Sequence, residues 1–383
     1  MKIVLSVGYH RPIILGMEPF ALRRMTHDFH TLTQSSPLSG SASRRNVAAI
    51  CRPLAALCAG ATVATLGLVL AGCGGAARVP GQVTERQLGY VRGEPALDSA
   101  KKKLEAGDTT GARLELMRLI ETNPQMGEAQ LVLGDLYFNE GNYDAAEPRF
   151  RKAAQVEPQN FRSQFMHGLT LHALDRLQEA VGAYLRALTI NPLDFDANVN
   201  VASAYYALGD FSQALPFAQQ SVRLNPRHGQ ARYNLAATLA ALDRHEEAVV
   251  EFQQATELVT ITPQLLVSMA ESLIRTRRFD EAKAALERSI KLSPSPIAFE
   301  RLGSTNFRLN NMAEASANFE AAMQLDPDYY PALNGVGVCE LNRWLESNRL
   351  DDAARQRGIG ALRRSLQIKR AQPKVEDLLA RYK

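Results

Sequence analysis

The chain has 383 residues, of which 46% are hydrophobic, 7% aromatic and 22% charged, values that are ordinary for a soluble chain. Its formal net charge of +4 arises within residues 1–72, because residues 73–383 carry 37 Lys/Arg against 38 Asp/Glu. A global basic field for nucleic acid is therefore excluded.

The N-terminal segment has the order of a signal peptide. Arg44, Arg45 and Arg52 precede an uncharged apolar run, residues 54–70, which is followed by small residues and then Cys73. A positive flank, an apolar run and a small-residue cleavage site follow one another in secretory leaders. We therefore predict a leader over residues 1–72.

The end of this apolar run reads Leu70-Ala71-Gly72-Cys73. The tetrad resembles the lipobox of bacterial lipoproteins, which implies that Cys73 is acylated, for example by palmitate, and becomes the first residue of the mature chain. In that family, Gly74 after the cysteine favours the outer membrane. Two or more acyl chains would give stable anchoring.

Two alternatives to a lipoprotein leader stay open. One is an uncleaved membrane helix, for which the run 54–70 is short, and the other is a cytoplasmic scaffold. The segment before the cysteine is also long for such a signal, and Ser43–Val47 faintly resembles a twin-arginine signal. Residues 73–95, rich in Gly, are predicted to form a flexible tether.

A repeat with a period of about 34 residues dominates the rest of the chain. It places a small residue, then an alanine twelve positions later, then an aromatic or leucine four positions after that, and finally a proline that ends the second helix. The alanines are Ala112, Ala146, Ala180, Ala214, Ala248, Ala282, Ala315 and Ala361.

These columns together closely resemble the tetratricopeptide repeat, as in LVLGDLYFNEGNYDAAEPRFRKAAQVEPQN (131–160). The resemblance covers residues 96–372 and implies an all-α fold, a right-handed α-solenoid of about eight TPR helical hairpins. We expect the hairpins at 96–124, 125–158, 159–192, 193–226, 227–260, 261–294, 295–327 and 328–372. Residues 373–383 are predicted to form a capping helix, because a terminal repeat has no neighbour to cover it.

The resemblance also implies a concave groove lined by the first helix of each hairpin. Phe138, His172 and Tyr206 would form an aromatic stripe, and Asn200 and Asn234 an amide ladder that holds peptide backbone. Core packing is the alternative interpretation for these residues. The full set expected to face the groove is Asp135, Phe138, His172, Asn200, Ser203, Tyr206, Asn234, Glu271, Arg301 and Phe307.

One subtype of groove is excluded by these residues. Chaperone-tail clamps use Lys and Asn at set groove positions to hold a terminal carboxylate. The asparagine position is occupied here by Asp135, Leu169, Ser203, Ala237, Glu271 and Ser304. That set cannot assemble a clamp. Because the residues of the groove are mixed in charge, the groove is expected to bind something other than a strongly charged tail.

The last repeat is irregular, with about twelve extra residues around 344–356. Trp344, the only tryptophan, lies there and suggests a partner-specific protrusion; a lengthened helix pair with a tolerated loop is the simpler interpretation. Residues 343–383 hold eleven Lys/Arg against five Asp/Glu. This excess could contact anionic lipid or an acidic partner, or could simply be solvated.

Catalytic and metal-binding motifs are absent from the sequence: it has no P-loop, G-x-G-x-x-G, H-E-x-x-H or paired C-x-x-C. His167 and His172 are five positions apart and do not share a helix face well. We therefore predict no enzymatic activity, no cofactor and no metal. Lone Cys339 is expected to be a small core residue.

The sequence therefore predicts a non-enzymatic scaffold that is lipid-anchored through Cys73 and faces the periplasm. It would capture peptide or helix segments of protein partners in its groove, in envelope, pilus or secretion assembly. The alternatives are an envelope carrier that binds glycan or a small ligand, an adaptor that recruits a cell-wall hydrolase, and an enzyme or enzyme subunit.

Overall fold

The computed structural model describes the backbone of residues 85–382 and the side chains of residues 94–382. Over this range the chain consists of helices, with no strand. The helices are α2 (Glu85–Glu105), α3 (Thr109–Thr122), α4 (Gly127–Asn139), α5 (Tyr143–Val156), α6 (Phe161–Ala173), α7 (Leu177–Ile190), α8 (Phe195–Leu208), α9 (Phe211–Leu224), α10 (Gly229–Ala241), α11 (His245–Leu258), α12 (Pro263–Arg275), α13 (Phe279–Leu292), α14 (Pro296–Arg308), α15 (Met312–Leu325), α16 (Tyr330–Glu346), α17 (Asp352–Ile368) and α18 (Pro373–Tyr382).

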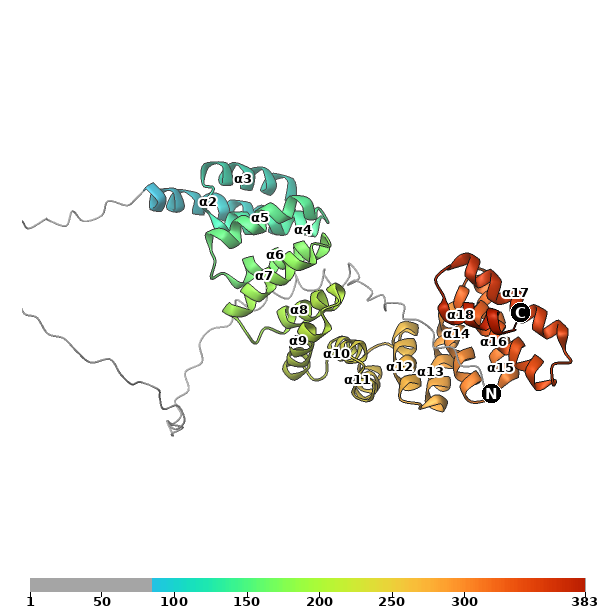
Figure 1. Cartoon of the computed structure of the whole chain (residues 1–383). Helices are drawn as coiled ribbons and strands as arrows, with labels where there is room; N and C mark the ends of the chain where they lie inside the picture. The colour runs from blue at the N-terminus through green and yellow to red at the C-terminus, as the bar shows by residue number, and fades with distance from the viewer. Residues whose placement is uncertain (1–84, 383) are drawn as a thin grey trace, which may run out of the picture. The chain divides into compact units, whose positions relative to one another are not determined.

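The helices pair in chain order into hairpins, α2 with α3 through α16 with α17 (Figure 1). In each hairpin we call the earlier helix the first helix and the later one the second helix. Each second helix also packs on the first helix of the next hairpin. The predicted all-α architecture of about eight hairpins is therefore confirmed.

Small residues let the two helices of a hairpin approach closely. A Cβ atom on Gly134 would lie 2.7 Å from the ring of Phe150, and one on Gly168 would lie 2.6 Å from the ring of Tyr184. Because real Cβ contacts are longer than 3 Å, only glycine fits these positions without a shift. The predicted small column and the predicted aromatic column are thus two sides of one contact.

The alanine column is fully buried from Ala112 to Ala315, but Ala361 is wrong as its last member, because it is only half-buried. Gly358 occupies the corresponding place. It is buried, and a Cβ atom there would lie 3.0 Å from the backbone oxygen of Gly337, while Leu362 takes the aromatic position beside Gly337. Because α16 and α17 are longer than the helices of the preceding hairpin, the residue at the alanine position is Gly358 and not Ala361, which the spacing along the chain suggests.

The turn inside each hairpin contains a residue with left-handed backbone. Glycine serves at Gly107, Gly141 and Gly209, with φ of 83°, 76° and 82°. Non-glycine residues take the same place in later repeats at Asp243 and Arg277, both with φ of 62°. The conformation ends the first helix, since the next N–H groups bond back to its last carbonyls, as Arg278 does to Leu273 at 2.8 Å.

Replacing Arg277 by glycine is expected to raise the free energy of unfolding by about 0.5 to 1 kcal/mol. A left-handed backbone is strained for residues with a Cβ atom, and glycine removes that strain at a smaller entropic cost. Gly209→Ala is the reverse change at the equivalent turn and should cost about 1 kcal/mol. Urea unfolding followed by circular dichroism measures both, and a destabilised Arg277→Gly protein would contradict the prediction.

The last hairpin is a lengthened helix pair covered by α18. Helices α16 and α17 have 17 residues each, whereas α14 has 13 and α15 has 14. Val375, Leu378 and Leu379 of α18 are buried against the α16–α17 hairpin. The predicted capping helix is therefore present, and the extra residues extend helices as well as the turn.

Two predicted features lie at or beyond the edge of the described residues. Helix α2 begins at Glu85, so the last part of the predicted tether 73–95 is helical. Cys73 and the tetrad to which it belongs, like the apolar run 54–70, lie outside the described residues. Among the helices that are described, none is long and apolar enough to span a membrane.

Candidate interaction surface on the first helices

Polar side chains link the first helices of successive hairpins. Arg162 at the start of α6 donates to Asp135 of α4 at 2.7 Å. Arg301 of α14 donates to Glu271 of α12 at 2.9 Å. Three residues of the predicted groove set, Asp135, Glu271 and Arg301, therefore make ion pairs that cross from one repeat to the next.

Arg301 also holds a carboxylate inside the protein. Glu300 is fully buried and accepts from Arg301 at 2.7 Å and from the Ser304 hydroxyl at 3.0 Å. Burial opposes the charge on Arg301, but the Glu300 and Glu271 carboxylates outweigh it and raise the pKa of Arg301. A single guanidinium therefore bonds to two carboxyl groups, of which Glu300 is buried and Glu271 is partly exposed.

We call the polar side chains that link the first helices the polar row. Tyrosines of α8 and α10 belong to it as well. The hydroxyl of Tyr206 is buried and has no hydrogen-bond partner among the described residues. Burial, with smaller contributions from Tyr233 and Glu271, raises the pKa of Tyr206. Burial also raises the pKa of Tyr233, against a hydrogen bond with Ser268 that lowers it. These side chains connect α8, α10 and α12 on the same row.

The predicted aromatic stripe packs within the repeats. Phe138 is buried, with ring centroids 5.1 Å from Tyr143 and 6.2 Å from Phe150. Tyr206 packs edge-on against Phe211 at 5.0 Å. His172 lies 6.3 Å from the ring of Tyr184, and burial lowers the pKa of its imidazole despite the nearby Asp175.

The remaining residues of the predicted groove set are mostly polar and local in their bonding. Asn200 is buried and donates to the backbone oxygen of Asp196 at 2.8 Å, while Asn234 accepts from Gln230 at 3.0 Å. Each amide therefore bonds within its own helix. Ser203 is half-buried, and Phe307 is half-buried against the clusters formed by α15, α16 and α17.

Asp196 is a member of this surface that sequence reasoning missed. It is the second residue of α8, as Glu128 is of α4 and Arg162 of α6. Glu128 pairs with Lys101 of the preceding first helix at 2.5 Å, and Arg162 pairs with Asp135. In the next repeat Leu169 stands at the position equivalent to Asp135. Asp196 therefore has an apolar residue where the equivalent residues Glu128 and Arg162 have a charged partner. The sequence signal for Asp196 was available in these two sets of equivalent positions, compared from one repeat to the next.

Asp196 is consequently a half-buried carboxyl group without a partner among the described residues. Burial, together with repulsion from Asp194, raises the pKa of Asp196 to about 6. Burial likewise raises the pKa of Asp135 to about 6, even though Arg162 lowers it. Strongly perturbed carboxyl groups on one face are more frequent at functional sites than elsewhere.

Replacing Asp196 by asparagine is expected to stabilise the protein by about 1 kcal/mol at pH 7.5 and by nearly nothing near pH 4. A carboxyl group whose pKa is raised above 3.8 to about 6 on folding holds its proton more tightly in the folded state, so it costs stability as the pH rises through this window. Urea unfolding at the two pH values measures the effect.

Asp144→Asn is the matched control, since Asp144 is the second residue of α5 and is exposed. It should lose a few tenths of a kcal/mol of helix-dipole stabilisation at pH 7.5. Equal behaviour of the two variants would contradict the proposed burial penalty.

Cys339 and Trp344, which the sequence analysis also singled out, both pack against neighbouring side chains. The Cys339 thiol is buried beside Phe319, and this burial, with the Glu340 and Glu320 charges, raises its pKa to about 12. Trp344 lies in the last turn of α16, edge-on to Tyr382 of α18 at 6.0 Å. The guanidinium groups of Arg349 and Arg355 lie over its ring at 5.6 Å and 5.9 Å.

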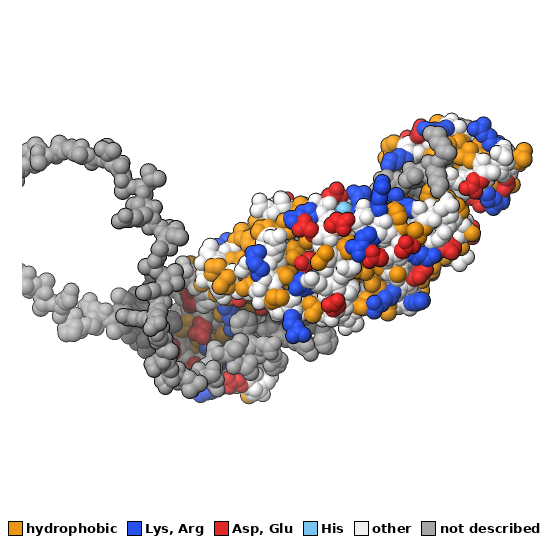
Figure 2. Space-filling model, turned by 90° about the horizontal axis from the view of Figure 1, so that it is seen from below, with side chains coloured by type: hydrophobic (Ala, Val, Ile, Leu, Met, Phe, Trp, Pro, Cys, Tyr) orange, Lys and Arg blue, Asp and Glu red, His pale blue; other side chains and the backbone are white. Residues whose placement is uncertain are grey.

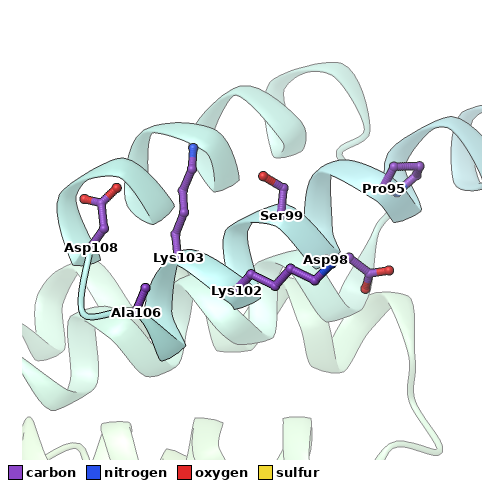
Figure 3. Close-up of a pocket in the computed structure, with 7 residues that line it drawn as sticks. All are labelled: Pro95, Asp98, Ser99, Lys102, Lys103, Ala106 and Asp108. Carbon is purple, nitrogen blue, oxygen red and sulfur yellow. The ribbon is translucent and has the colours of Figure 1, made fainter.

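A polar pocket on α2 lies apart from this row (Figure 3). It is lined by Pro95, Asp98, Ser99, Lys102, Lys103, Ala106 and Asp108. Two of its polar side chains are already engaged, because Ser99 and Lys103 both bond to Glu115 of α3, at 3.1 Å and 2.8 Å. Within residues 94–382 no group of His, Cys, Asp and Glu is arranged to hold a metal ion.

Comparison with known proteins identifies the repeat. A family model described as tetratricopeptide repeat matches residues 97–147, 131–195, 201–264 and 267–330, together more than half of the chain. No curated protein matches the chain.

Several solved structures are similar to it. A tetratricopeptide repeat protein from Parabacteroides merdae is 19% identical, with 67% of this chain and 98% of that chain covered and a TM-score of 0.49. YrrB, described as a TPR protein with an unusual peptide-binding site, is 18% identical (52% and 98% covered, TM-score 0.42). The Pseudomonas aeruginosa pilF structure is 19% identical (55% and 95% covered, TM-score 0.43).

Proposed function

The chain belongs to the tetratricopeptide-repeat family, and from that premise we propose that it is a lipid-anchored scaffold of the bacterial cell envelope. Repeats of this family form protein-interaction scaffolds and are generally non-catalytic. The proposed mechanism is capture of a peptide or helix segment in a concave groove along the first helices. The proposed context is envelope, pilus or secretion assembly, at the periplasm-facing side of the outer membrane.

The packing of the first helices is the observation that carries the groove proposal. First helices of successive repeats contact each other directly from α6 to α16, and second helices of successive repeats approach each other less closely. A layer whose members lie closer together is the inner layer of a curved stack. The polar row that contains Asp135, Asp196, Glu271 and Arg301 belongs to this layer.

The charges of this layer set the kind of segment that it would accept. Asp135 and Arg162 neutralise each other, whereas Asp196 has no base among the described residues and Arg301 is shared by two acids. On the face shown in Figure 2, acidic and basic side chains are interspersed. The proposed ligand is therefore a segment of mixed polarity with one or two basic residues.

Site-specific photocrosslinking tests the groove in the native envelope. A photoreactive residue at Ser203 or Asn234, both half-buried on first helices, should yield a crosslinked protein partner. The same residue at Gln253, which is exposed on the second helix α11, should not. Equal crosslinking from all three positions would contradict capture by the first helices.

Acyl labelling tests the anchor separately. The proposal requires fatty-acid label on the wild-type protein and none after Cys73→Ser, together with release of the variant from the membrane at high salt, which screens electrostatic contacts. A Cys73→Ser protein that stays membrane-bound at high salt would argue against the acyl anchor and leave the scaffold proposal untouched.

Two other outcomes would redirect the proposal. Binding of cell-wall fragments that is lost in Tyr206→Ala would favour a glycan carrier, although burial of the Phe138 and Tyr206 rings leaves little aromatic face for a sugar. Recovery of a cell-wall hydrolase as the crosslinked partner would favour a recruiting adaptor.

A further inference from the structure

A second charged surface lies at the other end of the repeats, where α17 turns into α18. The segment 353–375 contains seven Lys/Arg and no Asp/Glu. Arg363, Lys369, Arg370 and Lys374 are exposed in the last part of α17, in the connecting segment and in the first turn of α18. We call these four residues the basic elbow.

The other bases of this segment are paired. Arg355 bonds to Asp352 at 2.7 Å, Arg357 to Glu340 at 2.9 Å, and Arg364 to Asp328 at 3.0 Å. These ion pairs connect α17 to its own first turn, to α16 and to the turn before α16. Structural roles thus account for three of the seven positive charges.

None of the four bases of the basic elbow makes an ion pair with an acid among the described residues, and the nearest acids along the chain are Glu376 and Asp377, two and three positions after Lys374. Arg363, Arg370 and Lys374 make no ion pair there, and Lys369 donates to the Tyr330 hydroxyl at 3.0 Å and lies 4.9 Å from the centre of the Tyr330 ring. Lys374 lies in the first turn of α18, where the helix dipole disfavours a positive charge. Folding therefore does not explain why a base occupies this position.

An exposed apolar side chain directly precedes two of these charges in the chain. Ile368, the last residue of α17, is 42% exposed and is followed directly by Lys369 and Arg370. A cluster of basic side chains on long flexible stems around an exposed aliphatic group suits a surface of densely spaced anionic head groups. An acidic peptide would need fixed partners at defined positions, whereas these four charges are spread over three different elements.

We propose that the basic elbow binds the surface of an anionic phospholipid membrane. The contact goes beyond the groove and the acyl chain: it is a separate electrostatic signal that orients the terminal repeat toward the bilayer. Lipid chains combined with a polybasic patch give stronger membrane association than either alone.

Vesicle co-sedimentation of the full-length chain carrying Cys73→Ser tests this contact without the acyl chains. Vesicles of phosphatidylcholine alone are compared with vesicles that also contain phosphatidylglycerol. The elbow variant carries Arg363→Gln, Lys369→Gln, Arg370→Gln and Lys374→Gln. We expect this variant to lose at least about tenfold in partition onto the anionic vesicles, and the wild-type preference to fall as salt is added.

The matched control removes four exposed bases elsewhere, with Arg118→Gln, Arg227→Gln, Arg288→Gln and Lys291→Gln. It has the same net charge as the elbow variant and should keep the wild-type partition. The leader is identical in all three proteins, so its own affinity cancels in the comparison. Circular dichroism and α18 protection in hydrogen exchange show that the elbow variant is folded.

Three results would overturn the proposal. The first is an elbow variant that partitions like the wild type, and the second is an equal loss in the control variant, which would indicate net charge alone. The third is binding of a fluorescent oligoglutamate peptide that is lost in the elbow variant while vesicle partition is unchanged, which would assign the surface to an acidic protein. None of these results depends on acylation at Cys73 or on groove binding.

Discussion

Replacing Arg301 by methionine is expected to lower the free energy of unfolding by about 3 to 5 kcal/mol. The substitution leaves Glu300, which is fully buried, without its ion-pair partner at 2.7 Å, and it also releases Glu271 of the neighbouring repeat. An unpaired charge in the interior is among the most costly defects a single substitution can create. Urea unfolding followed by circular dichroism measures the loss.

Two further variants separate the buried charge from the loss of packing. Adding Glu300→Gln to Arg301→Met removes the orphaned carboxylate, and we expect the double variant to recover more than half of the loss. Arg288→Met, which alters an exposed arginine of α13, should change stability by less than about 0.5 kcal/mol. A cost below about 1 kcal/mol for Arg301→Met would show that Glu300 does not depend on Arg301.

The Gly168→Ala substitution is expected to cost about 1 to 3 kcal/mol. The new Cβ atom would lie 2.6 Å from the ring of Tyr184, which is fully buried and cannot move without displacing its neighbours. The helices α6 and α7 would have to separate, and the gain that alanine usually brings to a helix would be outweighed. Chemical unfolding measures the change.

Gly182→Ala is the control within the same hairpin. Gly182 lies inside α7, and its nearest contact would be the flexible end of Arg186 at 3.6 Å. This substitution should stabilise the protein by about 0.5 to 1 kcal/mol, because alanine is the better helix former. Destabilisation by both substitutions, or by neither, would contradict the view that Gly168 is required by the close approach of two helices.

These two sets of variants concern different properties of the repeat. Gly168 and Tyr184 belong to the contact that forms each hairpin, whereas Arg301 joins the first helices of neighbouring hairpins. In a solenoid each repeat contacts only its neighbours, so stability is approximately a sum of hairpin terms and interface terms. Loss at Arg301 should therefore weaken the interface between α12 and α14 first, which hydrogen exchange can localise.

The unpaired carboxyl group of Asp196 adds a functional argument to this picture. Asp196 is a half-buried acid that lowers stability at neutral pH, and the apolar Leu169 at the corresponding position of the preceding repeat provides no positive charge to neutralise it. Stabilising substitutions often lie at positions that function requires. If Asp196→Asn both stabilises the protein and weakens crosslinking from Ser203, the residue serves the partner.

The sequence alone determined the repeat and its hairpins. The regular spacing of small residues, alanines, aromatics and prolines reports local requirements that every repeat shares: a close helix approach, a buried contact and a helix end. Such requirements depend on residues within one hairpin and its neighbours, so they are visible as columns. The cap at α18 followed from the same logic.

Only the tertiary structure decided which side chains of the first helices meet. Whether Arg301 pairs with Glu300, whether Asp196 finds a base, and whether Phe138 is open or buried depend on the rotation of one helix against the next. The register of the last repeat depended on the extra turns of α16 and α17, which placed Gly358 in the column. Spacing along the chain specifies the face of a helix, but the neighbour that packs against this face decides whether a residue there is buried, paired or left free to bind.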